Sequence, residues 1–275
     1  MKPKAFEYIR ARSVSEALAV LDRDGDDAKI IAGGQSLVAM MNIRLVEPKK
    51  LIDISHIEEL SQIRINGDVI EVGAAVTQAR LMAWAELGRL SPLLAMALPH
   101  IGHYQTRSRG TVCGSIAHSD PSSELPLCLA TLGGSVVLRS SQGSRVVSAA
   151  EFQIGMLATA RSANEMVVAV RFPVAHPKTG YFFNEATQRH GDFAMCAVAA
   201  VVSESNIRLG VGGVAEQPTV RDWKNLAVND LGDALNQFAW DLGGSDDIHA
   251  TAEYRRQLVR NLGRQAILEA RKCQK

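Results

Sequence analysis

The stretch from Lys29 to Leu45, KIIAGGQSLVAMMNIRL, constrains the fold of this chain more than any other segment. A short apolar run, the Gly33-Gly34 pair and a second apolar run predict a strand, a tight corner and a helix in succession. Such a corner places backbone N–H groups at the start of a helix, where an anion can be bound. A Gly-Gly pair is more often only a turn, so an anion site here requires a second feature elsewhere in the chain.

The size and charge of the chain indicate an ordinary globular protein. Its 275 residues can bury a sizeable core in two or three subdomains. The 30 Lys and Arg residues balance 29 Asp and Glu residues, so nothing in the charge favours nucleic acid or an anionic membrane as a partner. No apolar stretch approaches the roughly 20 residues of a membrane span, and the first residues lack a secretory apolar region. We therefore expect a cytoplasmic protein with no membrane span.

The four cysteines predict no metal or iron–sulfur site in this chain. Cys113, Cys128, Cys196 and Cys273 include no C-x-x-C pair, the spacing that zinc knuckles and many iron–sulfur motifs use. We expect reduced cysteines that are buried or incidental.

The pattern of apolar residues predicts an α+β fold with alternating helices and strands. Asn66-Gly67 and Gln142-Gly143 each indicate a hairpin turn between two strands. Ser13 and Glu16 have the spacing of a capping box at the start of a helix. Helices are predicted at 13–21, 77–87, 91–98, 121–132, 230–240 and 249–270, and strands at 29–32, 51–54, 166–172, 181–186, 194–202 and 207–211.

Composition predicts a domain boundary in the polar, proline-containing stretch 174–179. Beyond it, the three strands could form an antiparallel sheet. The last helix would cover that sheet with Tyr254, Leu258, Leu262 and Ala266, which recur at four-residue spacing.

A polar, glycine-punctuated loop is predicted at 102–114. The second informative stretch is Arg109–Pro126, RGTVCGSIAHSDPSSELP, which begins in that loop. Gly110 and Gly114 bracket small residues that let a ligand approach the backbone. Nearby carboxylates can accept hydrogen bonds from sugar hydroxyls. Two such loops could clamp one diphosphate between them. Neither loop fits G-x-G-x-x-G or G-x-x-x-x-G-K-[ST], which excludes the Rossmann and P-loop motifs.

Taken together, AGGQS at 32–36 and RGTVCGSIAHSDP at 109–121 resemble the FAD-binding medium subunit of molybdenum hydroxylases. These are the carbon monoxide dehydrogenase-like and xanthine dehydrogenase-like enzymes. The resemblance covers nearly the whole chain, including LIDIS at 51–55 and GDFA at 191–194. It implies an FAD-binding fold of the vanillyl-alcohol-oxidase (PCMH) type in two α/β subdomains, 1–55 and 56–175. A C-terminal domain, 176–275, would hold a three-stranded antiparallel sheet with helices.

The resemblance also implies a set of cofactor contacts and no catalytic or metal-binding residue in this chain. The two loops would wrap the FAD diphosphate and adenosine side, while Glu124 matches an acidic flavin contact. Ile101 and Val167 match apolar positions beside the ring system, and Tyr104 could pack on the isoalloxazine or lie on the surface. The implied set is Lys29, Ile30, Ile31, Ala32, Gly33, Gly34, Gln35, Ser36, Ile101, Tyr104, Thr111, Val112, Gly114, Ser115, Asp120, Glu124 and Val167.

Two positions depart from the family pattern. Cys113 stands where relatives commonly have a glycine, a costly change if the backbone there needs a positive φ. Glu185, or Asn184 with another gap placement, stands where many relatives have a lysine. A lysine near the flavin would stabilise a reduced anionic ring, so its loss would tend to lower the flavin potential.

Several residues allow other interpretations of their role. His118, Ser119 and Asp120 are the residue types of a hydrolase triad, but adjacent loop residues rarely adopt its geometry. His100 and His103 could hold a metal if a third ligand were near. Arg107 and Arg109 could neutralise the charge of a diphosphate or anchor their loop by salt bridges. Met40 and Met41 are most simply residues of the hydrophobic core.

The resemblance implies an electron-transfer subunit that binds FAD non-covalently. Electrons would come from a molybdopterin cofactor on a large subunit through [2Fe–2S] clusters on a small subunit, in a dimer of heterotrimers. They would leave to oxygen, NAD or another acceptor. The alternatives are a self-contained FAD oxidoreductase and a scaffold subunit that has lost FAD. The substrate, chosen on the molybdenum subunit, stays open.

Overall fold

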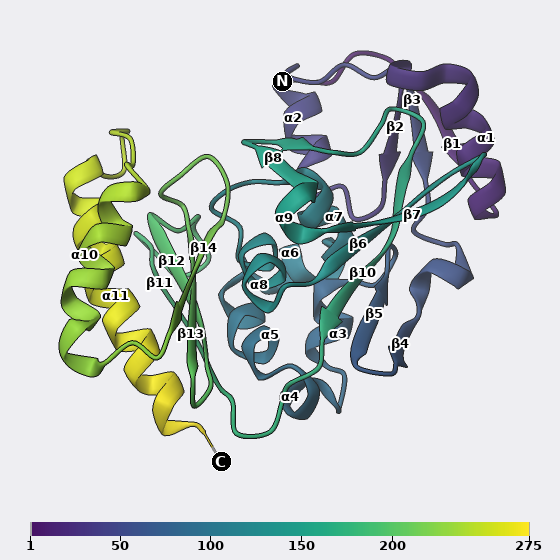
Figure 1. The fold of residues 1–275 in the computed structure, drawn as a ribbon. Coiled ribbons are helices and arrows are strands. Elements are labelled where there is room, and N and C mark those ends of the chain that lie inside the picture. The colour runs from purple at the N-terminus through teal and green to yellow at the C-terminus, as the bar shows by residue number, and fades with distance from the viewer. Residues whose placement is uncertain (1, 275) are drawn as a thin grey trace.

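Three main β-sheets and the helices packed on them make up the computed structural model, which describes residues 2–274 (Figure 1). The first sheet is parallel, with strand order β1-β3-β2. Ser13 accepts the backbone N–H of Glu16 at the start of α1, as the capping-box spacing predicts. The predicted strand, Gly-Gly corner and helix are confirmed as β2, residues 32–36 and α2. The bounds are β1 (Glu7–Arg10), α1 (Val14–Asp24), β2 (Ala28–Ile31), α2 (Leu37–Asn42) and β3 (Lys50–Asp53).

The second sheet is antiparallel and has the order β4-β5-β10-β6-β7. Its two outer strand pairs are the hairpins predicted at Asn66-Gly67 and Gln142-Gly143. β10 lies at the centre and buries most of its length because both neighbours and the helices cover it. The bounds are β4 (Ile63–Asn66), β5 (Val69–Gly73), β6 (Ser135–Ser140), β7 (Gly143–Ser148) and β10 (Met166–Pro173).

Six helices lie between β5 and β6, and two predictions for this region were wrong. The predicted helix 77–87 is two short helices separated by a turn at Ala83–Glu86. The predicted loop 102–114 is largely helical, because Gly102 and Gly110 bound one helix and the Thr111 side chain caps the next. The bounds are α3 (Gln78–Met82), α4 (Leu87–Leu90), α5 (Pro92–Ala97), α6 (Tyr104–Arg109), α7 (Val112–His118) and α8 (Glu124–Leu132).

The C-terminal sheet is antiparallel and has four strands where three were predicted. The missed strand is β14, whose sequence TVRDWK lacks apolar alternation; its Asp222 pairs with Arg208 of β13. α5 and α8 cover one face of the sheet and α10 and α11 the other (Figure 1), so β12 is apolar on both faces. The bounds are β11 (Gly180–Ala186), β12 (Cys196–Val202), β13 (Asn206–Gly212), β14 (Thr219–Lys224), α10 (Leu231–Asp241) and α11 (Ala252–Lys272).

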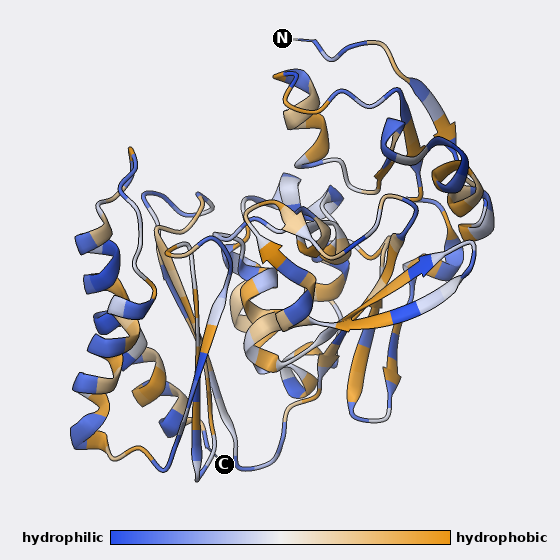
Figure 2. Ribbon diagram, turned by 45° about the horizontal axis from the view of Figure 1, so that its top comes forward, coloured by the Kyte–Doolittle hydropathy of each residue, from blue (hydrophilic) through white to orange (hydrophobic). Residues whose placement is uncertain are grey.

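The buried face of α11 is rotated by about one residue from the predicted one. Tyr254 is half exposed, and the neighbouring Arg255 is buried instead. Arg255 can be buried because its Nη1 donates to the carbonyl of Met195 at 2.7 Å and its Nη2 bonds the Asp247 carboxylate at 2.6 Å. Figure 2 shows the outer helices alternating between hydrophilic and hydrophobic residues, while the central helices and strands are mostly hydrophobic.

Short elements complete the described chain. The pair β8 and β9 forms a small separate hairpin, and α9 precedes it. No helix within residues 2–274 is long and apolar enough to cross a membrane. The remaining bounds are α9 (Ala149–Phe152), β8 (Gln153–Gly155), β9 (Ala158–Thr159), η1 (Gly25–Asp27), η2 (Glu58–Ser61), η3 (Leu98–His100) and η4 (Val228–Asp230).

Candidate cofactor-binding site

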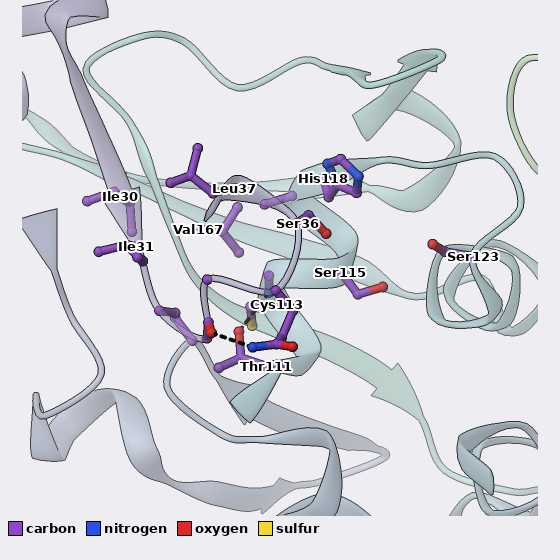
Figure 3. A pocket seen from close by; sticks show the side chains of 18 of the residues that line it. Ile30, Ile31, Ser36, Leu37, Thr111, Cys113, Ser115, His118, Ser123 and Val167 are labelled. Carbon is purple, nitrogen blue, oxygen red and sulfur yellow. Dashed lines mark hydrogen bonds between the residues drawn. The ribbon is translucent and has the colours of Figure 1, made fainter. Parts of the chain in front are cut away.

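A cavity of about 690 Å³ lies between the Gly33-Gly34 corner, the helix α7 and the segment that leads into β10 (Figure 3). The loop 191–193, which joins β11 to β12, also lines it, so the region of the C-terminal sheet contributes to the site. This volume falls within the range of about 300–1,000 Å³ that cofactor pockets usually have. The lining is mainly apolar and backbone, with a few polar side chains.

The two loops predicted from the sequence meet at Gly33. A Cβ atom on Gly33 would lie 2.1 Å from the carbonyl oxygen of Arg109 and 2.8 Å from Cα of Gly110. Only glycine permits this approach of one backbone to the other. Gly34 has a φ of +70°, which also favours glycine and turns the chain into α2. The corner therefore holds both loops against one wall of the cavity.

The second loop predicted from the sequence, Arg109–Pro126, contains the helix α7. The Thr111 hydroxyl accepts the backbone N–H of Gly114 at 3.0 Å, which caps the helix. Cys113 lies inside this helix, and its φ is not positive. Its thiol donates to the carbonyl of Val72 at 3.3 Å, and its side chain is buried. The glycine that the family resemblance led us to expect here is therefore not required by the backbone of this chain.

Most of the residues implied by the resemblance line the cavity, and three lie outside its lining. Tyr104 is 70% exposed on α6, and Val112 is buried in the core. Asp120 accepts the backbone N–H of Ser122 at 2.8 Å in a turn before α8. Those in the lining are Lys29, Ile30, Ile31, Ala32, Gly33, Gly34, Gln35, Ser36, Ile101, Thr111, Gly114, Ser115, Glu124 and Val167.

Sequence reasoning missed other lining residues, among them Gln78, Leu157, Arg161 and Phe193. Leu157 and Arg161 flank β9 in a segment without a glycine-rich or acidic pattern. Met40 lines the cavity as well, whereas Met41 alone is the buried core residue that was predicted. The GDFA segment at 191–194 was noted in the sequence as part of the family resemblance, but Phe193 was not predicted to contact a cofactor.

Glu124 brings a buried carboxyl group to the cavity. Its residue is 6% exposed, and it stands in the first turn of α8. Burial raises the pKa of Glu124 to about 7, and the charges of Glu185 and Asp120 act in the same direction. Its own backbone N–H and His100 oppose the rise. At neutral pH this group can therefore exist both as a hydrogen-bond donor and as an acceptor.

The sequence of the chain matches the profile of a family described as the FAD binding domain in molybdopterin dehydrogenase over residues 4–175. The match covers more than half of the chain. This chain belongs to that family.

Individual relatives support the same membership. The chain is 34% identical over 283 residues to the 6-hydroxypseudooxynicotine dehydrogenase complex subunit alpha of Paenarthrobacter nicotinovorans, covering 98% of this chain and 96% of the relative. It is 37% identical to caffeine dehydrogenase subunit beta of Pseudomonas sp. strain CBB1, over 78% and 73% of the two chains.

Among solved structures, a chain of carbon monoxide dehydrogenase from Hydrogenophaga pseudoflava superimposes with a TM-score of 0.95 at 31% identity, covering 100% of both chains. The protein is thus an FAD-binding medium subunit of the molybdenum hydroxylase family, and an oxidoreductase component with that family's fold.

The cavity of this FAD-binding subunit fits an extended dinucleotide. At Gly33 the backbones of the two loops approach so closely that only glycine fits, and no side chain separates this backbone from the cavity. Exposed backbone of this kind suits a diphosphate. The apolar Ile101 and Val167 suit flat rings, and Glu124 suits a polyhydroxyl chain. The residues present therefore fit the cofactor that the family name states.

The geometry does not support the hydrolase or metal readings. The Ser119 hydroxyl is buried and points to the carbonyls of Gly155 and Ala158, while burial lowers the pKa of His118, which lines the cavity (Figure 3). His100 and His103 both face His190 at ring distances of 6.3 and 6.5 Å. Within residues 2–274, no group of three potential ligands is placed to hold a metal ion.

Arg107 anchors its loop, but through carbonyl groups and not through a salt bridge. Its Nη1 donates to the carbonyl of Ile101 at 2.8 Å and to that of Gly102 at 3.0 Å. The side chain therefore fixes the turn that carries Ile101 into the cavity wall. Arg109 contributes its backbone carbonyl to the contact with Gly33.

Proposed function

We propose that this subunit binds one FAD in the cavity described above and passes electrons from a partner subunit to an external acceptor. The single observation that carries the proposal is the close approach of Gly33 to Arg109 beside a cavity of about 690 Å³. This approach presents two stretches of backbone on one side of a space whose volume is in the range of cofactor pockets. The membership in an FAD-binding family agrees with it.

In this proposal the protein binds, orients and encloses the cofactor. FAD, when bound, accepts two electrons and can deliver them singly or as a pair. The loops at Gly33–Ser36 and Thr111–Ser115 hold its diphosphate, and Glu124 contacts the flavin half. The apolar lining excludes water from the ring system. The residues of this chain need no acid or base role for electron transfer.

The electrons enter from other subunits. We propose a large subunit with a molybdopterin cofactor and a small subunit with [2Fe–2S] clusters as partners, arranged as a dimer of heterotrimers in the cytoplasm. The relative from Paenarthrobacter is a subunit of a dehydrogenase complex, and the carbon monoxide dehydrogenase structure is described as lacking the Mo-pyranopterin moiety of its molybdenum cofactor. Caffeine, 6-hydroxypseudooxynicotine and carbon monoxide appear in the names of the relatives, so the shared subunit does not fix a substrate.

Purification of the full chain tests the binding part of this proposal. We expect a yellow protein, or a colourless one that turns yellow with added FAD and releases flavin on denaturation. A protein that takes up no flavin after incubation with FAD contradicts the proposal and favours a scaffold subunit.

Reduction experiments test the electron-transfer part. The flavin absorbance of the isolated subunit should stay oxidised with candidate substrates such as N-heterocycles or aldehydes. It should bleach anaerobically when the large and small subunits are added with the substrate of the complex. Steady turnover by the isolated subunit contradicts the proposal and indicates a self-contained oxidoreductase.

A further inference from the structure

Arg161 is a half-buried arginine that lines the cavity without a carboxylate partner among residues 2–274. Its Nη1 donates to the carbonyls of Ser162 and Glu165, each at 2.8 Å. Its Nε and Nη2 donate to no protein atom of that described range. Burial lowers the pKa of Arg161, which reflects the cost of holding this charge away from water. A guanidinium in this position has donors and a flat face left for a ligand.

The turn that carries Arg161 is held from both sides. Arg145 of β7 bonds the Glu165 carboxylate with its Nε at 2.6 Å and its Nη2 at 2.8 Å. The same carboxylate accepts the backbone N–H of Ser162 at 2.8 Å. Arg145 Nη2 also donates to the carbonyl of Ala160 at 2.7 Å. The guanidinium of Arg161 is therefore positioned before a ligand arrives, which lowers the entropy lost on binding.

Arg161 lies at the end of the cavity that β2 forms. Asp26 acts on the charge of Arg161 and also lies 3.8 Å from the Lys29 ammonium group. Leu21, Ala28 and Ile30 supply an apolar wall to the same cavity. Gly191 belongs to a different part of the wall, because a Cβ atom there would lie 2.8 Å from the carbonyl of Gly102. Arg161 and Lys29 thus lie at one end of the cavity, both near Asp26, and this end is separate from the wall near Ile101.

We propose that Arg161 binds the adenosine half of FAD, an inference that rests on the proposed function. The Gly33 corner would hold the diphosphate, so the β2 end receives adenosine and the wall near Ile101 receives the flavin. A guanidinium offers a flat cationic face for an adenine ring and N–H donors for the adenosine phosphate. Arg161 would accordingly favour a dinucleotide over a flavin mononucleotide.

Binding to the flavin-free full chain tests this assignment. The variants are Arg161→Leu, which removes both the positive charge and the flat guanidinium group, and Arg161→Lys, which keeps the charge but not the flat group. Arg64→Leu is the matched control, because Arg64 is exposed on β4 outside the cavity lining. FAD affinity is measured by flavin fluorescence quenching, and affinities for FMN and ADP are measured by calorimetry.

We expect Arg161→Leu to bind FAD and ADP about tenfold more weakly, a change of about 1.4 kcal/mol. Its affinity for FMN should stay within about twofold of wild type. Arg161→Lys should lie between the two, and Arg64→Leu should match wild type. If lysine restores ADP binding fully, the phosphate is the contact; if it restores none, the adenine ring is the contact.

Two outcomes overturn the assignment. One is unchanged affinity of Arg161→Leu for FAD and ADP. The other is an equal loss of FMN affinity, which places the effect on the flavin half or on the fold. If Arg161→Leu does not fold by circular dichroism, the ADP affinity of Arg161→Lys decides. Failure of the wild-type chain to bind FAD contradicts the proposed function itself. This result is therefore distinguishable from a failure of the Arg161 assignment, in which wild type still binds FAD.

Discussion

Nδ1 of His100 lies 3.2 Å from Oε1 of Glu185, and this contact joins η3 to β11 of the C-terminal sheet. The Glu185 side chain is 3% exposed, and its Oε2 has no hydrogen-bond partner within residues 2–274. The hydrogen bond raises the pKa of His100, against the opposing effect of burial. Glu185 is therefore a buried carboxylate whose balancing charge depends on a proton on His100.

The first prediction concerns the pH dependence of this pair. Because the folded-state pKa of His100 is raised, its contribution to stability is fully present below the ordinary histidine value of about 6.5. The contribution is lost as the pH rises through the raised value. We expect Glu185→Gln to lower the free energy of unfolding by about 1–3 kcal/mol at pH 5.5 and by less at pH 8.5.

Thermal unfolding followed by circular dichroism between pH 5.5 and 8.5 measures this difference. Glu204→Gln is the control, since Glu204 is exposed and its ion pair with Lys178 is long, at 4.0 Å. It should shift stability little at any pH. A Glu185→Gln difference that is constant with pH would show that the charge of His100 plays no part.

The second prediction concerns Glu124, whose pKa is raised from 4.5 to about 7. The folded state binds this proton more tightly than the unfolded state, so stability falls as the pH rises from 4.5 to 7. At pH 8 the full cost is about 3 kcal/mol. Glu124→Gln should therefore stabilise the flavin-free chain at pH 8 and change it little near pH 4.5, while weakening FAD binding at pH 8.

Denaturant unfolding at pH 4.5 and pH 8 and an FAD titration check both parts. Glu216→Gln provides a control at an exposed carboxylate with no ion pair among the described residues. Equal stability of Glu124→Gln and wild type at pH 8 would contradict the raised pKa. Unchanged FAD affinity would contradict the flavin contact.

The third prediction concerns the cysteines. Burial raises the pKa of the thiols of Cys113, Cys128 and Cys196, whereas Cys273 is exposed. Only the thiolate reacts readily, so iodoacetamide should modify Cys273 alone in the folded chain and all four after denaturation. Peptide mass spectrometry measures the sites. Labelling of Cys113 in the native chain would show that α7 opens.

Sequence reasoning predicted the elements with strong local signals. Asn66-Gly67 specifies a hairpin through its turn geometry, and the Gly33-Gly34 corner follows from the apolar runs on either side. β14 was missed because Arg221 and Asp222 interrupt its apolar residues, and it exists through pairing with β13. Tertiary pairing of this kind leaves no periodic pattern in one strand.

The candidate site was predictable only in part, for a similar reason. Gly33 and Thr111 lie in segments whose glycines and small residues are visible in the sequence. Arg161 reaches the same cavity from the turn before β10, where it bonds the carbonyl of Glu165 and where Arg145 holds the Glu165 carboxylate, all outside those segments. Tyr104 was predicted beside the flavin as one option, yet α6 turns it outward to 70% exposure.

The last prediction concerns Gly33→Ala. The φ of Gly33 is not positive, so alanine causes no backbone strain there, and the effect is the contact of its Cβ with the carbonyl of Arg109 at 2.1 Å. That oxygen is backbone, so the two loops must separate by about an ångström or more, given normal van der Waals contact distances. We expect FAD affinity to fall at least about tenfold, because a displacement of this size removes well-aligned hydrogen bonds to the diphosphate.

Gly88→Ala is the matched control, since a Cβ atom at Gly88 in α4 meets nothing within 4 Å. It should leave FAD affinity unchanged and raise stability by up to about 1 kcal/mol through helix propensity. Fluorescence quenching by FAD and thermal unfolding measure both variants. Wild-type FAD affinity in Gly33→Ala would mean that the approach of the two loops is not what builds the diphosphate site, and the clamp would then have to lie elsewhere along the cavity.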